Sequence, residues 1–272
     1  MTPPSLAGVI AKLERAQEHL DALEHEARVF VHSNPYRLVF QFNHETGWHD
    51  GHVRVIRDPP LRLATILGDA IQNARASLDH LIVQLVIANG EKPIRPNAFP
   101  IHKDVRAFIN GVGRYGRNPR RTRYSPLRGV DRESWALIER LQPYMRRERA
   151  EVHPLAVLNE LSRIDKHEIL HAVALSLAPE VPDLRFTGPD DRPDIIEAKF
   201  VPGVRFEHDA VVLRLRVHGP DPDPEMQMHG ELPMEIRFGE RLLRRDDVQR
   251  LRDVAADVVV QLGTPLGLLP TS

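Results

Sequence analysis

The sequence predicts an α+β protein: a bundle of long amphipathic helices with an N-terminal β-hairpin and a β-rich C-terminal region closed by a helix. Three observations support this class. Apolar residues recur every three or four positions over two long stretches, which is helical spacing. Elsewhere apolar and polar residues alternate, which is typical of half-buried strands. The 272 residues are 42% hydrophobic, enough for a sizeable core.

The first helix is predicted to start after Ser5, a good N-cap residue, and to run for about six turns to Ala27. Its apolar stripe is Leu6, Val9, Ile10, Leu13, Ala16, Leu20, Leu23 and Ala27. Residues 28–58 then contain RVFVH, YRLVFQF and HVRVIR, with the turn-like NHETGWHDG before the last of them, and predict a hairpin. The second long helix is predicted over 61–88, where Asn89 and Gly90 end it.

Residues 91–130 are rich in Pro, Gly and Arg, and they predict a long loop with one short helix near KDVRAFI. Asp131 can cap a helix that runs to about Leu141. Pro154 suits the first turn of another helix, predicted to continue to about Leu177.

Beyond Pro179 the segments DLRFTG, GVRFEHDAVVLRLRVHG and ELPMEIRFG predict strands, and residues 241–262 predict a closing helix. We therefore expect a helical region over 1–178, including the hairpin (28–58) and the basic loop (91–130), and a β-rich region over 179–272. Strands of the hairpin can join the C-terminal sheet, which favours one composite domain over two independent ones.

The composition restricts the classes of partner. Lys and Arg number 37 against 38 Asp and Glu, so no global field attracts nucleic acid or an anionic membrane, and any such attraction has to be local. The absence of cysteine excludes disulfides, thiolate chemistry and Cys-based metal sites, and it fits a reducing cytosol. No signal-peptide pattern and no apolar run of roughly 18 residues is present, so we expect a cytoplasmic protein with no membrane partner.

The string HEILH within RIDKHEILHAV matches the zinc-peptidase pattern H-E-x-x-H. On a helix His167 and His171 could bind one Zn²⁺, with Glu168 as the general base for a bound water. No third ligand follows at a suitable spacing, and the charged Asp165 and Lys166 precede the first His. We therefore expect no metal and no cofactor, and D-K-H is either a polar site between helices or a solvated turn.

A second motif, NARASLDHL at 73–81, lies on the second long helix. An ion pair from Arg75 to Asp79 one turn later is the ordinary structural explanation of both residues. Arg75 and His80 also form R-x4-H, which resembles the motif of HEPN domains. Many HEPN domains are metal-independent ribonucleases that act as dimers, while others only bind nucleotides or RNA. With FPIH, LQPY and HPLAVLNELSRIDKH, the pattern over about 60–171 further resembles a group of uncharacterised bacterial proteins.

The HEPN resemblance implies that Arg75 stabilises a phosphate and that His80 is an acid or base. Asp165, Lys166 and His167 are further candidates, since His, Arg and Lys can support RNA cleavage by the 2′-OH near pH 7 without a metal. Residues five apart on a straight helix diverge by about 140°, so the pair requires a second helix or a homodimer.

The basic loop contains the candidate nucleic-acid contacts. Between 102 and 128 the only acidic residue is Asp104. Arginines there could neutralise phosphates while interleaved tyrosines stack on bases. The candidates are Arg114, Arg117, Arg120, Arg121, Arg123, Tyr115 and Tyr124. The alternative is an arginine-biased composition on a solvated loop, because only five of the 37 basic residues are Lys.

The sequence is compatible with three classes of function. The first is an RNA-directed, HEPN-like protein, with metal-independent endoribonuclease activity as its catalytic form. The second is a non-catalytic binding or interaction module. The third is a zinc metallopeptidase that uses HEILH.

Overall fold

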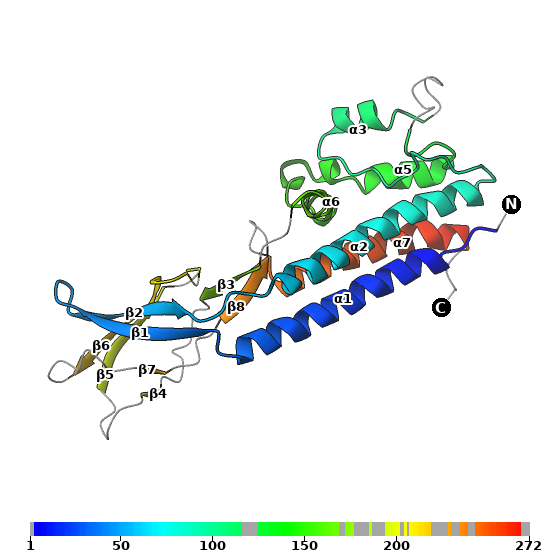
Figure 1. Cartoon of the computed structure of the whole chain (residues 1–272). Helices are drawn as coiled ribbons and strands as arrows, with labels where there is room; N and C mark the ends of the chain where they lie inside the picture. The colour runs from blue at the N-terminus through cyan, green and yellow to red at the C-terminus, as the bar shows by residue number, and fades with distance from the viewer. Residues whose placement is uncertain are drawn as a thin grey trace. The chain divides into compact units, whose positions relative to one another are not determined.

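The computed structural model confirms the α+β class (Figure 1). The chain divides into two compact units, each built from separate segments of the sequence. Unit 1 comprises Met1–Ala22, Thr65–Leu170 and Arg245–Ser272, and unit 2 comprises Leu23–Ala64 and His171–Arg244. The structure describes residues 3–115, 125–168, 172–176, 185–186, 194–201, 204–205, 207–218, 228–229, 234–238 and 243–267.

Unit 1 is built on α6 (Pro154–Asp165), α7 (Arg245–Gly263) and the greater part of α1 (Ala7–His32) and α2 (Leu61–Ala88). The last residues of α1 and the first of α2 belong to unit 2. α2 has the bounds that the sequence predicts. The apolar stripes of these helices pack against one another and form the core, because burying apolar surface away from water is favourable. Fully buried members of that core include Ala16, Leu20, Leu67, Leu78, Leu81, Leu85, Leu155, Leu158, Ala255 and Val258.

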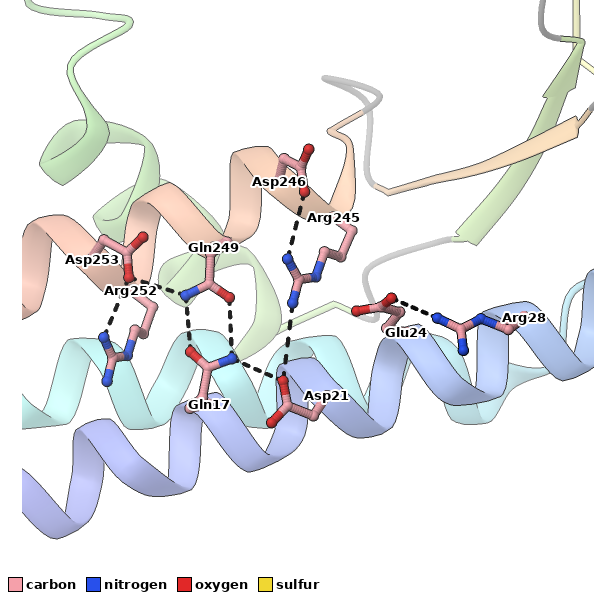
Figure 2. A network of polar contacts seen from close by, with 9 residues as sticks. All are labelled: Gln17, Asp21, Glu24, Arg28, Arg245, Asp246, Gln249, Arg252 and Asp253. Carbon is pink, nitrogen blue, oxygen red and sulfur yellow. Dashed lines mark hydrogen bonds and ion pairs between the residues drawn. The ribbon is translucent and has the colours of Figure 1, made fainter.

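Polar contacts fix how α1 lies against its neighbours in unit 1. The amide of Gln17 donates to Gln249 of α7 at 3.2 Å, and the amide of Gln249 donates back at 2.9 Å (Figure 2). Toward α2, Lys12 Nζ donates to Asn73 Oδ1 at 3.2 Å. These reciprocal and cross-helix bonds are directional, so they specify a register that apolar packing alone leaves loose.

The connection between α2 and α6 contains short elements. α3 (Val105–Gly111) is capped by Asp104, whose side chain accepts from the Ala107 amide. α5 (Arg132–Arg140) is capped by Asp131, which accepts from two backbone amides, as the sequence predicts. A 3₁₀ helix, η1 (Pro143–Arg149), follows.

Unit 2 contains a four-stranded antiparallel sheet in the order β1 (Tyr36–Asn43), β2 (Trp48–Val55), β6 (Val211–His218), β5 (Asp194–Phe200). The N-terminal hairpin thus joins C-terminal strands, as expected. The buried residues of one face of this sheet include Leu38, Phe40, Val53, Leu213 and Leu215. Two further pairings among the described residues are β3 (Ala172–Ser176) with β8 (Met234–Phe238), and β4 (Arg185–Phe186) with β7 (Met228–His229).

The sequence-based boundaries are wrong at two places. RVFVH was predicted as β-rich, but α1 continues to His32 because Phe30, 4% exposed, extends the buried stripe by a further turn. The helix from Pro154 was predicted to reach Leu177, but it ends at Asp165, and Ala172–Ser176 pair with β8 instead. The strand Asp194–Phe200 was not predicted. No helix within the described part of the chain combines the length and apolarity needed to cross a membrane.

Candidate functional site

The polar contacts of Arg75 connect α2 to the backbone of Phe99 and to α6. Its guanidinium forms an ion pair with Asp79 at 2.5 Å, as expected from their spacing. It also donates to the carbonyl of Phe99 at 2.8 Å and to Asn159 Oδ1 at 3.3 Å. The carboxylate of Asp79 accepts from the Phe99 amide at 2.9 Å. Arg75 and Asp79 therefore hold both backbone groups of Phe99.

Gln142 holds the next residues of the same segment. Its side-chain oxygen accepts from the His102 amide at 3.0 Å, and its side-chain nitrogen donates to the Pro100 carbonyl at 2.8 Å. Gln142 is 1% exposed, so these bonds satisfy an amide that burial would otherwise penalise. The backbone of residues 99–102 is thus fixed from both sides, and it places His102 beside α6.

A cleft of about 420 Å³ opens between this segment and α6. Its walls carry the cations Lys103 and Arg163, the carboxylates Asp104 and Glu160, and the imidazole of His102. Its lining residues are Ile101, His102, Lys103, Asp104, Ala107, Ala156, Asn159, Glu160 and Arg163. Burial lowers the pKa of His102 from its usual value of 6.5, so the ring is neutral at pH 7 and can accept a proton.

Contacts join η1 to one wall of this cleft. The ring of Tyr144 in η1 contacts Phe108 of α3 at a centroid separation of 5.7 Å, and Lys103 pairs with Glu151 at 2.5 Å. These two contacts join η1 and the residues after it to the wall of the cleft that Lys103 and α3 form. Four exposed arginines stand on α3 and η1: Arg106, Arg146, Arg147 and Arg149.

The structure separates the two residues of the R-x4-H motif. Arg75 faces Phe99 and Asn159, and its side chain is only 13% exposed. His80 is exposed, and a Cβ on Gly8 of α1 would lie 4.0 Å from its Nδ1. The two side chains therefore point toward different neighbours, in keeping with their helical spacing.

The three D-K-H residues are also divided. Asp165 lies between helices: its carboxylate accepts from Gln72 Nε2 at 3.0 Å. Lys166 and His167 are exposed in the turn that follows α6. Arg75 and Asp165 are thus brought to the same contact between α2 and α6, while Lys166, His167 and His80 are not part of it.

The zinc hypothesis required HEILH on a helix, and α6 ends before it. His167 and Glu168 lie in the turn, and residues 169–171, including His171, lie outside the described residues. Of the predicted nucleic-acid contacts, Arg114 and Tyr115 are described, and the ring of Tyr115 contacts Trp135 at 5.6 Å. Arg117, Arg120, Arg121, Arg123 and Tyr124 also lie outside the described residues.

Sequence reasoning missed His102, Asn159 and the arginines of η1. The strings FPIH (99–102) and LQPY (141–144) do contain residues of the hydrogen-bond network around the cleft. Phe99 accepts from Arg75, and Pro100 accepts from Gln142. The run RRER at 146–149 was a usable signal of local positive charge. Nothing in the local pattern of α6 distinguishes Asn159, because its role depends on Arg75 in a different helix.

Comparison with protein families, with curated proteins and with solved structures finds no match. The resemblance to HEPN domains therefore stays a prediction, and function has to be argued from the site.

Proposed function

We propose that the protein is an RNA-directed binding module in which the cleft beside α6 and the arginines of α3 and η1 contact RNA phosphates. The observation that supports it best is the cleft itself, because one of its walls is joined to α3 and η1, which carry four exposed arginines. A neutral, reducing cytosol, which suits a chain without cysteine, is the compartment in which we expect this binding.

Local charge supports this proposal although the whole chain has a net charge of -1. Residues 91–168 contain 17 Lys and Arg against 10 Asp and Glu, so this stretch is positive while the remainder is negative. Phosphate contacts supply most of the affinity of non-specific RNA binding, and they need clustered cations rather than a high overall charge. The residues that line the cleft all belong to this stretch.

We favour binding over a reaction catalysed by the R-x4-H helix, because the guanidinium of Arg75 already has hydrogen-bond partners within the protein. Its donors are directed at Asp79, Phe99 and Asn159, and few remain for a phosphate. A guanidinium used in this way contributes to the fold and positions the cleft through Asn159. The exposed cations around the cleft are the ones available to a ligand.

The test measures RNA binding against salt concentration, using fluorescence anisotropy of a labelled single-stranded RNA. Neutralising Arg146, Arg147 and Arg149 together to Gln should reduce the slope of log affinity against log salt by about 2, through lost counterion release. The matched control changes two exposed arginines elsewhere in unit 1, Arg15→Gln and Arg250→Gln, and should leave the slope unchanged. Absence of RNA binding by the parent at low salt contradicts the proposal.

A metal-independent ribonuclease is the second candidate, and the observation that favours it is His102 in the cleft. In this arrangement the neutral imidazole of His102 takes the 2′-OH proton as that oxygen attacks phosphorus, and Lys103 and Arg163 stabilise the developing phosphorane. As the P–O5′ bond breaks, the imidazolium so formed returns a proton to the leaving 5′-oxygen. Such an enzyme would cleave single-stranded RNA in EDTA and leave 2′,3′-cyclic phosphate ends.

The cleavage assay compares two histidine variants. If the cleft is catalytic, His102→Ala should reduce the rate by roughly 10² or more, while His80→Ala keeps the parent rate. Loss of cleavage in His80→Ala alone would instead assign the reaction to the R-x4-H helix acting with a second copy of the chain. A parent that cleaves no RNA leaves the binding module as the function.

A further inference from the structure

The second face of the four-stranded sheet in unit 2 has a different composition from the buried one. Strand alternation places one row of side chains across all four strands: Gln41, Asp50, Arg214 and Lys199 are successive partners. The next row contains Asn43 with Trp48, and Glu197 with Arg216. This second face, which we call the Trp48 face, is therefore polar and cationic around a single tryptophan.

Two cations lie over the ring of Trp48. Lys199 Nζ lies 4.5 Å from the centre of its ring, and the guanidinium carbon of Arg216 lies 4.6 Å from it. Such contacts stabilise both partners, since the ring face is the negative part of an indole. They also keep one aromatic ring and one guanidinium plane together on the central strands β2 and β6.

Two carboxylates fix the cations of this face. Asp50 accepts from Arg214 Nε at 2.9 Å and from Asn43 Nδ2 at 3.2 Å. Glu197 pairs with Lys199 at 2.9 Å and, more loosely, with Arg216 at 3.9 Å.

Exposure differs among the charges of this face. The side chain of Asp50 is 12% exposed, whereas those of Arg214, Lys199 and Glu197 are 51%, 59% and 41% exposed. The surface that solvent meets is therefore cationic around Arg214 and mixed around Glu197.

The positive character extends along the sheet. Arg37 and Arg54 are register partners four residues beyond Gln41 and Asp50 along β1 and β2, on the same face. Arg54 pairs with Asp209 at 2.8 Å and contacts His208 at the same distance, while Arg37 is exposed. The Trp48 face thus contains five Lys and Arg side chains with Asp50 and Glu197 among them, and with Asp209 at its edge.

We infer that the Trp48 face binds single-stranded nucleic acid, with a base stacked on Trp48 or Arg216 and phosphates against the surrounding cations. An open antiparallel sheet with an aromatic ring among cations suits this ligand, because every base has a π-face and every linkage has a charge. A duplex keeps its bases stacked inside and offers phosphates alone. An acidic peptide would match the charge but would leave the ring without a planar partner.

The experiment uses the full chain with one substitution that leaves a single fluorescent reporter. The sequence has two Trp, and Trp135 is 5% exposed in α5, so Trp135→Phe leaves Trp48 as the sole indole and keeps an aromatic ring in the core. Titration with an oligouridylate of about eight nucleotides, within the usual site size, should quench Trp48 fluorescence to saturation at low salt. Adding Lys199→Gln and Arg216→Gln should weaken this binding roughly tenfold or more.

The controls separate this site from the cleft in unit 1. Arg163→Gln should leave the quenching of Trp48 unchanged, so failure of the proposed cleft does not affect the result. Unfolding in urea, followed for each variant, confirms that the substitutions leave the fold intact. The inference is overturned if oligouridylate causes no quenching, or if heparin or an RNA duplex quenches Trp48 as strongly as the single strand.

Discussion

The two sides of α2 are built from similar residues and have different consequences. The side toward α6 carries Gln72, Arg75 and Asp79, and each of these makes hydrogen bonds to another part of unit 1. The side toward α1 carries Asn73, His80 and Gln84: Asn73 bonds to Lys12 of α1, Gln84 accepts from the Ser5 amide just before α1, and His80 is exposed. Both sides look like polar stripes in the sequence, but only the first fixes a backbone segment that lines a cleft.

The difference shows that the role of a polar residue on a helix depends on whether nearby backbone groups lack hydrogen-bond partners. The Phe99 amide and carbonyl have no strand or helix to bond with, so Arg75 and Asp79 supply partners for both. His80 has no comparable task. A pair such as R-x4-H, which suggests one function in the sequence, can therefore unite one structural residue with one surface residue.

The largest expected effect is the loss of Arg75. Arg75→Ala should lower the free energy of unfolding by about 3 kcal/mol, because it leaves Asp79, Asn159 and the Phe99 carbonyl without their shared donor. Urea denaturation measures this effect. Arg75→Lys should recover part of the loss, since an ammonium keeps the charge but cannot form the same fork of bonds. A change below about 0.5 kcal/mol in Arg75→Ala would show that the contact is not structural.

The next effect is expected at Gly68, where α2 approaches Asp165. A Cβ at Gly68 would collide with the Asp165 carboxylate, so Gly68→Ala should cost about 2 kcal/mol. In an Asp165→Ala background the same change should instead stabilise by up to about 1 kcal/mol, because alanine is the better helix former. Thermal or urea unfolding of the four proteins gives the coupling. If Gly68→Ala changes the free energy of unfolding in the same direction in both backgrounds, α2 and α6 accommodate the added methyl group without a collision.

A small effect is expected on the other side of α2. His80→Ala should change the free energy of unfolding by less than about 0.5 kcal/mol, because the side chain is exposed. The measurement is the same urea series used for Arg75→Ala, so that the two positions of the motif are compared directly. Destabilisation by more than about 2 kcal/mol would place His80 among the structural contacts and remove the contrast.

The smallest effect concerns the pH dependence of stability. Burial lowers the pKa of His102, and burial together with Arg146 lowers that of His153, so the unfolded state binds more protons than the folded state just below pH 6.5. Stability should therefore fall as the pH is lowered from about 7 through 6.5 toward the folded pKa values. His102→Asn should reduce this dependence, measured as urea midpoints at several pH values. A steeper dependence in the variant would contradict the assignment.

The helix boundaries that depend on local sequence signals were predicted correctly at α2 and at the start of α5. The spacing of apolar residues and the stop at Asn89 and Gly90 gave both ends of α2, and Asp131 marked the start of α5. The end of α6 was mispredicted because Ala172–Ser176 gain their partner from residues 234–238, which no local pattern reveals. The cleft escaped prediction for the same reason, since Gln142 and Asn159 act on groups that only the folded chain brings near them.

The pairing of β2 with β6 has a consequence for how the chain is made. His49 and Leu215 are partners 166 residues apart (215 minus 49), so the edge of the N-terminal hairpin stays uncovered until those residues have been synthesised. At roughly 5 to 20 residues per second, that delay is on the order of 10 to 30 s. Gln17 waits longer still for Gln249. Throughout that interval the nascent chain presents an unpaired strand and an uncovered apolar helix, so its yield in a cell should depend on chaperones that shield such surfaces until the last helix emerges from the ribosome.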